Sequence, residues 1–360
     1  MTTDPPPDRV PPESKRAART WNRRILLALA AVMLTAVCAD VFVRVVGIGP
    51  RVYAPRRYEP GRRVPYAQLA GGPIVYQPNS HFASVYDDYR DDAAPQYASG
   101  AVEYVINEDG FRGPPTTVAK SAGMTRIVCL GDSVTFGEGV EESASYPRIV
   151  ERMLNEAAAA RRYEVINAGV QGHGTIDEYL YFKMHVARFK PDVVTLGFFL
   201  NDAMDGAQTI RQNEEWTREW ELSALSRFSR LAEIVERGRI ARRLQEEYFA
   251  AVRESFRSPR WDLCQRALSD FQHASIEGHF RFVMLIFPVP WSLDEDYPFN
   301  DIHGRILEAC RTRGIESLDL IECWRGVDAS DLWVHPTDHH PNARAHALAA
   351  RRIASVLMSQ

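Results

Sequence analysis

Five short apolar runs alternate with amphipathic stretches along the C-terminal two thirds of the chain, and this order limits the possible folds most strongly. The runs are "RIVCLG", "YEVINAG", "DVVTLGFF", "RFVMLIFPVP" and "IESLDLI". The amphipathic stretches lie at about 145–160, 175–189, 260–278, 301–313 and 342–357. Short apolar runs bounded by turn residues indicate buried strands. Strands that alternate with helices favour an α/β fold, in which helices cover a central parallel sheet of about five strands.

The N-terminal part contains one candidate for a membrane span. The run "ILLALAAVMLTAVCA", residues 25–39, is uncharged and follows a polar segment rich in arginine. Asp40 and Arg44 interrupt its continuation, yet residues 25–46 reach the roughly 20 residues that a spanning helix needs. We predict a cytoplasmic tail at 1–24 and an uncleaved transmembrane signal anchor at 25–46. A signal peptide cleaved after Ala39 and a buried helix are the alternatives.

The charges around this span favour one orientation only weakly. Arginines lie on both sides, and those that follow the span reduce the contrast expected from the positive-inside rule: Arg51, Arg56, Arg57, Arg62 and Arg63. We still expect a single-pass protein whose larger part lies outside the cytoplasm.

The remaining chain divides by composition. Residues 47–120 are rich in Pro, Tyr, Arg and Asp, with short alternating pieces such as "AVEYVIN" and a turn at "NEDGFRGPP", which predicts an irregular β-containing preface. Residues 121–360 form the main domain, with a charged helical insertion at about 203–260. Aromatic residues of this insertion either line an acyl or sugar site or pack a small helical core.

Charge and composition exclude several classes of protein. A formal charge of -4 and a pI near 6.2 provide no basic surface for nucleic acid. Five cysteines show no metal-ligand spacing, and they allow one disulfide without requiring it. The "DHHPNARAH" segment contains possible zinc ligands, but neither an HExxH nor a CxxC pattern accompanies it. We therefore expect no metal and no cofactor.

Polar clusters stand where the predicted strands end. "GDS" follows the first run, "NAGVQGHGT" the second and "FFLND" the third, whereas "DHHPN" lies after the last strand and ahead of a helix. Ligands and catalytic groups of a parallel sheet gather at the carboxyl ends of its strands. A serine hydroxyl needs a base to take its proton and a third group to hold that base. We predict Ser133 as the nucleophile, His340 as the base and Asp338 as its partner.

The negative oxygen that forms during attack on an ester needs hydrogen-bond donors. The backbone N–H groups of Ser133 and Gly172 and the side chain of Asn201 are the predicted donors of this oxyanion hole. Glycine at position 172 allows close approach of the backbone, since it has no Cβ. Each residue also has a structural alternative: Ser133 and Asn201 as caps or turn residues, and Gly172 as a turn former.

Other residues near the C-terminus offer a different acid and base. His339 precedes His340 and is an alternative base, and Asp331 with His335 is an alternative pair four residues apart. His173 and His346 are interpreted as structural or rim residues.

Together these blocks resemble the SGNH (GDSL-type) hydrolase superfamily, and within it the membrane-anchored bacterial members. The resemblance covers residues 125–358 and depends on Gly131, Asp132, Ser133, Gly172, Asn201, Asp202, Asp338, His340, Pro341, Asn342, Ala345 and His346. It implies a flavodoxin-like three-layer α/β/α sandwich whose serine attacks esters. Two positions depart from the family pattern. Asp338 and His340 are two residues apart where the family usually has three, and Phe199 replaces the usual glycine two residues before Asn201.

These observations lead to one functional hypothesis. We expect a serine esterase that acts, through an acyl-enzyme, on an acyl ester of a cell-envelope or exported glycan or lipid, with acetyl among the candidate acyl groups. An O-acyltransferase that uses the same residues is the first alternative. A non-catalytic, membrane-tethered binding protein of the same fold is the second.

Overall fold

The computed structural model describes residues 13–47, 56–58, 64–86, 100–158, 162–204 and 222–359. The chain divides into two compact units. The first unit consists of Met1–Arg51 and Arg218–Leu244, and the second of Val52–Thr217 and Gln245–Gln360.

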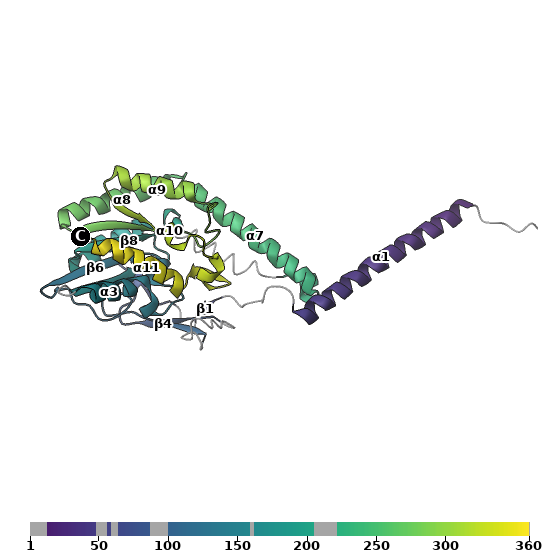
Figure 1. Ribbon diagram of the computed structural model, residues 1–360, viewed down its shortest axis with the longest axis horizontal. Helices are drawn as coiled ribbons and strands as arrows, with labels where there is room; N and C mark the ends of the chain where they lie inside the picture. Colours follow the sequence, from purple (N-terminus) through teal and green to yellow (C-terminus); the bar gives the residue numbers. More distant parts are fainter. Residues whose placement is uncertain are drawn as a thin grey trace, which may run out of the picture. The chain divides into compact units, whose positions relative to one another are not determined.

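A five-stranded parallel sheet forms the centre of the second unit (Figure 1). Its strands are β6 (Met124–Gly131), β7 (Arg162–Gly169), β8 (Val193–Phe198), β9 (Arg281–Ile286) and β10 (Glu316–Asp319). Their order is β10-β9-β8-β6-β7, and every neighbouring pair is parallel. Most residues of the inner strands β6, β8 and β9 are buried, as expected when helices cover both faces of a parallel sheet. The predicted α/β fold with its five-stranded parallel sheet is confirmed.

Five longer helices accompany the sheet. They are α3 (Tyr146–Ala157), α4 (Thr175–Met184), α8 (Pro259–Gly278), α9 (Asn300–Thr312) and α11 (Ala343–Met358). The helix α3 packs against α11, and α4 packs against α8. Two such pairs are expected when helices cover opposite faces of a doubly wound sheet. Each helix coincides, to within a few residues, with an amphipathic stretch of the sequence.

Shorter elements connect these helices and strands. They are α2 (Ser133–Phe136), η2 (Glu142–Ala144), η3 (Val186–Phe189), η4 (Leu200–Ala203), α10 (Ile321–Trp324), η5 (Ala329–Leu332), β11 (Trp333–His335) and β12 (Asp338–Pro341). The "DHHPN" segment precedes α11 as expected, but most of it is itself a strand. Its β12 pairs antiparallel with β11, with His335 opposite Asp338.

The preface consists of short strands that share the core of the main domain. The strands β1 (Arg57–Tyr58), β4 (His81–Val85) and β5 (Ala101–Val105) form an antiparallel sheet, and β2 (Tyr66–Gln68) pairs with β3 (Ile74–Tyr76). Tyr76, Phe82 and Tyr104 pack their rings around Phe136 of α2, at centroid distances of 4.8, 6.1 and 5.1 Å respectively. The preface therefore contributes to the same hydrophobic core as the sheet.

Arg112, in the "NEDGFRGPP" turn, holds the end of α2. Only 2% of this residue is exposed, and its guanidinium donates to the carbonyl oxygens of Phe136 (2.8 Å), Gly137 (2.6 Å) and Val140 (2.6 Å). It also lies over the Tyr104 ring, 4.7 Å from the centroid. One buried cation thus binds three carbonyl groups at and just beyond the C-terminal end of the short helix.

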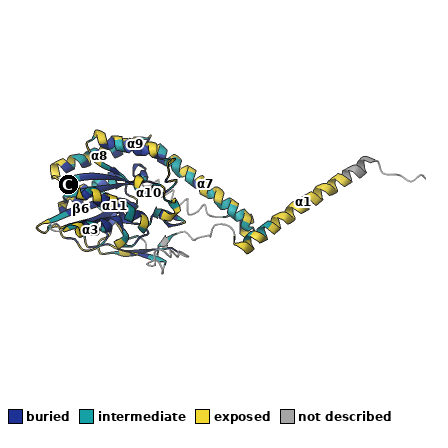
Figure 2. Cartoon of the chain, in the orientation of Figure 1, coloured by how far each residue is buried: buried dark blue, intermediate teal, exposed yellow. Residues whose placement is uncertain are grey.

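The helix α1 (Glu13–Val46) dominates the first unit. Its segment Thr20–Val46 is long and apolar enough to cross a membrane, with a mean hydropathy of 2.5 over its most apolar window, none of which is buried (Figure 2). Asp40 and Arg44, the two charged residues near the C-terminal end of this segment, pair with each other at 2.8 Å. Asp40 also accepts hydrogen bonds from Ser229 Oγ (2.9 Å) and the Leu231 N–H (2.8 Å).

The helical insertion is described from residue 222 onward. It contains α6 (Ala224–Phe228) and α7 (Arg230–Ser255), whereas Trp216 and Trp220 lie outside the described residues. Phe256, which follows α7, is 1% exposed and packs against Phe198 and Trp261. This aromatic residue therefore belongs to the core rather than to a binding site. All five cysteines of the chain are free thiols.

The burial of Arg112 predicts a large stability effect. We expect Arg112→Met to lower the free energy of unfolding by about 3 kcal/mol, because several buried carbonyl groups lose a charged donor. Arg188→Met is the matched control, since Arg188 is half exposed and pairs with Asp109 at 2.7 Å; it should cost less than about 1 kcal/mol. Urea unfolding of the full chain in detergent, followed by tryptophan fluorescence, measures both. Equal losses would contradict the role assigned to Arg112.

Candidate active site

The strand register brings three polar loops to the same edge of the sheet. Gly131, the last residue of β6, pairs with Gly169 of β7 on one side and with Gly197 of β8 on the other. The loops that carry Ser133, Gly172 and Asn201 therefore leave the sheet close to the same level. This is the edge where parallel α/β sheets bind their ligands.

The turn after β6 requires a glycine and is capped by an aspartate. Gly131 has a φ of +152°, and a Cβ there would lie 2.9 Å from the carbonyl oxygen of Gly197. Asp132 caps α2, since its Oδ1 accepts from the Val134 N–H at 2.8 Å. Ser133 is consequently the first residue of α2, directly beyond the edge of the sheet.

A chain of hydrogen bonds joins Ser133, His340 and Asp338. His340 Nδ1 lies 2.5 Å from Asp338 Oδ1, and His340 Nε2 lies 2.9 Å from Ser133 Oγ. Because a carboxylate can only accept, Nδ1 carries the proton of the neutral ring and Nε2 accepts from the serine hydroxyl. Alternate residues of a strand point to the same face, so the two-residue spacing on β12 places Asp338 and His340 together.

The alternative acids and bases have other partners. His339 stacks on Trp333 with ring centroids 4.0 Å apart. This is expected, because successive residues of a strand point to opposite faces, and His339 lies between Asp338 and His340 on β12. His335 Nδ1 lies 2.8 Å from Thr337 Oγ1, and Asp331 pairs with Arg344 at 3.1 Å. The rings of the two remaining histidines contact the backbone: His173 Nε2 lies 2.6 Å from the carbonyl oxygen of Ile74, and His346 Nδ1 accepts from the Tyr146 N–H at 3.2 Å.

The two adjacent histidines have pKa values that are shifted in opposite directions. Burial alone would lower the pKa of His340, but the charge of Asp338 and the hydrogen bond to it raise that pKa above its usual value. Burial would likewise raise the pKa of Asp338, yet His340 and Arg56 hold it far below its usual range. Burial lowers the pKa of His339 to about 4. Asp338 is therefore ionised, and His339 is neutral, across the physiological pH range.

Three further carboxyl groups are buried near Ser133. Burial raises the pKa of Asp132. Burial, followed by the charges of Glu178 and Asp132, raises the pKa of Asp202 well above its usual value. Burial, followed by Asp132 and Asp177, does the same for Glu178. In each case burial disfavours the ionised form of the carboxyl group. Sequence reasoning missed Glu178, which is simply one acid in the first turn of a predicted helix.

The preface supports the Gly172 loop. The β2–β3 hairpin contacts Gln171 twice: Tyr66 OH donates to Gln171 Oε1 at 3.1 Å, and the Gln171 N–H donates to Tyr76 OH at 3.3 Å. Gly172 has a φ of +78°, in the left-handed region that favours glycine. A Cβ at this position would meet no atom within 4 Å, so the site around it is open.

Asn201 lies in η4, directly after β8. Its side chain hydrogen-bonds to Asp132 and helps to lower the pKa of that carboxyl, against the larger effect of burial. Its Oδ1 is buried and has no hydrogen-bond partner among the residues that the structure describes. Phe199, which departs from the family pattern, donates its backbone N–H to Asp202 Oδ2 at 3.1 Å. The Asn201 amide therefore stands next to the residue that precedes Ser133.

Sequence reasoning also missed the residues around Asp338. Arg56 Nη1 lies 3.1 Å from Asp338 Oδ2 and 2.8 Å from Glu138 Oε1. Tyr86 OH donates to Asp338 Oδ2 at 2.9 Å. In the sequence, Arg56 is only one of five arginines that follow the candidate membrane span, and nothing there draws attention to Glu138. No spacing or motif connects either of them to Asp338.

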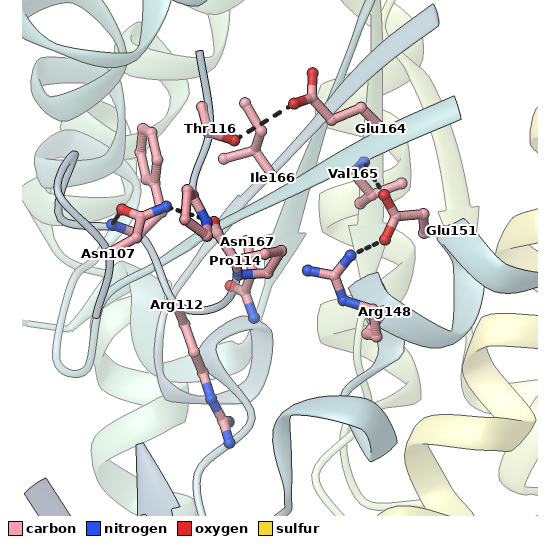
Figure 3. A pocket seen from close by; sticks show the side chains of 12 residues that line it. Asn107, Arg112, Pro114, Thr116, Arg148, Glu151, Glu164, Val165, Ile166 and Asn167 are labelled. Carbon is pink, nitrogen blue, oxygen red and sulfur yellow. Dashed lines mark hydrogen bonds and ion pairs between the residues drawn. The ribbon is translucent and has the colours of Figure 1, made fainter. Parts of the chain in front are cut away.

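A separate pocket lies between the preface, α3 and β7 (Figure 3). Its lining includes the ion pair of Arg148 with Glu151 and the hydrogen bond between Thr116 and Glu164. Neither Ser133 nor His340 lines it. Among the described residues, no group of three or more His, Cys, Asp or Glu side chains could hold a metal ion.

The contrast between the two histidines can be measured directly. We expect the ring of His340 to titrate above 6.5 and that of His339 at about 4, because Asp338 raises the first pKa and burial lowers the second. Carbon-proton NMR of the full chain in detergent, with ¹³C-labelled histidine, follows the titration of both rings. The variants His339→Gln and His340→Gln assign the two signals. A common midpoint, or the reverse order, would contradict the arrangement described above.

Comparison with known proteins agrees with this architecture. The model of the GDSL-like lipase/acylhydrolase family matches residues 129–348. Among curated proteins, no sequence matches the chain.

Several solved structures are similar in fold. A protein ascribed to the lipolytic G-D-S-L family from Desulfitobacterium hafniense DCB-2 is 15% identical and covers 64% of this chain and 99% of its own, with a TM-score of 0.41. The acetyl xylan esterase AlAXEase is 16% identical and covers 65% and 100%, with a TM-score of 0.42. The acetylxylan esterase Axe2 from Geobacillus stearothermophilus is 15% identical and covers 66% and 95%, with a TM-score of 0.41.

Because the family model spans more than half of the sequence, the chain belongs to the GDSL-like lipase/acylhydrolase family of the SGNH superfamily and is a serine ester hydrolase.

Proposed function

We propose that Ser133 is the nucleophile of an esterase, with His340 as general base and Asp338 as the group that orients it. The observation that supports this most directly is the continuous contact from Ser133 Oγ through His340 to Asp338, at 2.9 and 2.5 Å. A hydroxyl becomes a useful nucleophile only when a neighbouring base accepts its proton. His340 meets this need, since its Nε2 faces the hydroxyl while its Nδ1 is bound.

The reaction that we propose proceeds through an acyl-enzyme. His340 takes the proton of Ser133 while Oγ bonds to the acyl carbon, and it returns that proton to the departing alcohol as the ester C–O bond breaks. A water molecule then gives a proton to His340 and attacks the acyl carbon. The acid leaves, and the proton returns to Ser133 Oγ. Asp338 keeps the ring in the required tautomer and stabilises its charged form.

The proposed oxyanion hole consists of the backbone N–H groups of Ser133 and Gly172 and the side-chain amide of Asn201. The hydrogen bond of Asn201 with Asp132 supports its inclusion, because it keeps the amide beside the nucleophile. The open surroundings of Gly172 support the second donor, because no atom lies within 4 Å of the position that a side chain would occupy. Donors fixed before the reaction stabilise the transition state without reorganisation.

We propose that the enzyme is anchored by α1 and acts outside the cytoplasm on acyl esters, including acetyl esters, of envelope or exported glycans or lipids. The exposed apolar segment Thr20–Val46 supports the anchor. A location outside the cytoplasm in turn supports glycans or lipids of the envelope, or exported glycans, as the class of substrate. If a sugar hydroxyl, rather than water, resolved the acyl-enzyme, the same residues would catalyse acyl transfer.

Labelling with a fluorophosphonate tests the nucleophile without a known substrate. We expect the full chain in detergent to gain one adduct, seen by intact mass and located at Ser133 by peptide mapping. Ser133→Ala should abolish the adduct, and His340→Ala should slow its formation by at least about 1000-fold, because the hydroxyl loses its base.

His339→Ala is the matched control for this experiment. Its ring is the neighbour of His340 but stacks on Trp333, so the labelling rate should stay within about tenfold of the parent rate. The absence of an adduct on folded protein, or an adduct that survives Ser133→Ala, would overturn the proposal and favour a binding protein of the same fold.

The oxyanion donors are tested with p-nitrophenyl acetate. We expect Asn201→Ala to lower kcat by about 100- to 1000-fold with little change in KM, because the donor acts mainly in the transition state. Gly172→Ala should also lower kcat, since alanine disfavours the φ of +78° that orients the N–H. Circular dichroism verifies that both variants are folded. Unchanged kcat values would exclude these donors.

A further inference from the structure

A preface residue contacts the far side of the proposed acid. Asp338 turns Oδ1 toward His340, and its Oδ2 receives Arg56 Nη1 at 3.1 Å and Tyr86 OH at 2.9 Å. Arg56 lies next to β1, far from Asp338 in the sequence. The structure thus joins a residue that directly precedes β1 to the C-terminal part of the site.

Arg56 is itself held in place by a second carboxylate. Its Nη1 lies 2.8 Å from Glu138 Oε1, and the Glu138 side chain is completely buried. The same Oε1 accepts from Ser84 Oγ at 2.8 Å and from Tyr104 OH at 3.1 Å. The guanidinium also lies over the Tyr58 ring, 5.4 Å from its centroid. A guanidinium with this many partners, on a side chain that is only 24% exposed, has a defined position.

We propose that Arg56 is a positioning residue, which fixes Asp338 against His340 by bridging Asp338 and the buried Glu138. The inference rests on the catalytic roles proposed above for Ser133, His340 and Asp338. Arg56 does not contact Ser133 or the place of the ester. It acts through Asp338, and Glu138 acts through Arg56.

This bridge has an electrostatic consequence that a purely structural contact would not have. The positive charge of Arg56 lowers the pKa of His340, and the negative charge of Glu138 raises it, although burial and Asp338 have the larger effects. The variants below leave the other titratable residues that face His340 or its neighbours in place. These are Asp132 on the nucleophile loop, His335 on β11, His339 on β12, Tyr86 after β4 and His346 on α11.

Two substitutions should therefore move the pH dependence in opposite directions. Ser133 reacts only while His340 is neutral, so the rate rises with pH through the pKa of His340. Arg56→Gln removes a positive charge and should move the midpoint of this rise to higher pH. Glu138→Gln removes a negative charge and should move it to lower pH. Charges at this distance predict shifts of about one pH unit.

The experiment measures the second-order rate of fluorophosphonate labelling of the full chain in detergent between pH 4.5 and 9. Besides the shift, Arg56→Gln should lower the plateau rate by up to about 100-fold, because Asp338 is no longer fixed against His340. Arg56→Lys keeps the charge at a single nitrogen and should return the midpoint to that of the parent. Arg311→Gln is the matched control, since Arg311 is exposed and, within the described part of the chain, pairs with Glu308 of the same helix; it should change neither quantity.

The outcomes separate this inference from the proposed function. If the parent is labelled at Ser133 but Arg56→Gln and Glu138→Gln leave the midpoint unchanged, or move it in one direction, the bridge is refuted and the proposed function stands. If the parent is not labelled, both are overturned. If Arg56→Gln does not fold, the other two variants still test the inference. Glu138→Gln must lower the midpoint, and Arg56→Lys must leave it unchanged. Opposite shifts for the two Gln variants support the inference.

Discussion

The register of β6 against its two neighbours determines where the polar groups of this protein stand. Gly131, Gly169 and Gly197 lie opposite one another at the carboxyl edge of the sheet. A side chain on Gly131 would collide with the Gly197 carbonyl. The loops that follow can therefore begin at the same level and meet above the sheet. Apolar burial provides most of the stability of such a sheet, but this close approach of three backbones gives the site its geometry.

The preface is part of the architecture of the candidate site. Arg112 binds carbonyl groups at the end of the helix that begins with Ser133, and the β2–β3 hairpin supports the loop of Gly172. Arg56 reaches Asp338. The segments that carry Ser133, Gly172 and Asp338 are thus braced by residues that precede the sheet in the sequence. Bracing of this kind keeps functional groups within the narrow tolerance that catalysis demands.

Sequence patterns predicted the sheet because buried parallel strands need continuous apolar runs, as in "RIVCLG". They also predicted that Ser133, His340 and Asp338 would be brought together, since polar residues at strand ends share one edge. The strand conformation of Asp338–Pro341 was missed, because pairing with β11 decides it rather than local preference. Arg56 and Glu138 could not be found, since long-range ion pairs leave no periodic signal. Glu178 also leaves no signal in the sequence, because its raised pKa depends on burial in the tertiary structure.

The place of Arg56 in the chain defines how the enzyme tolerates shortening. It follows α1 in the sequence and precedes every strand of the preface that the structure describes, β1 included. A chain shortened to Asp40 would retain Arg56 and both of its carboxylate partners. Trimming to the start of β2 would keep the residues of the sheet, the serine and the histidine, yet remove the cation shared by two buried carboxylates. If Arg56 positions Asp338 as proposed, charge balance around Asp338, rather than the first strand of the sheet, sets the N-terminal boundary of the functional enzyme.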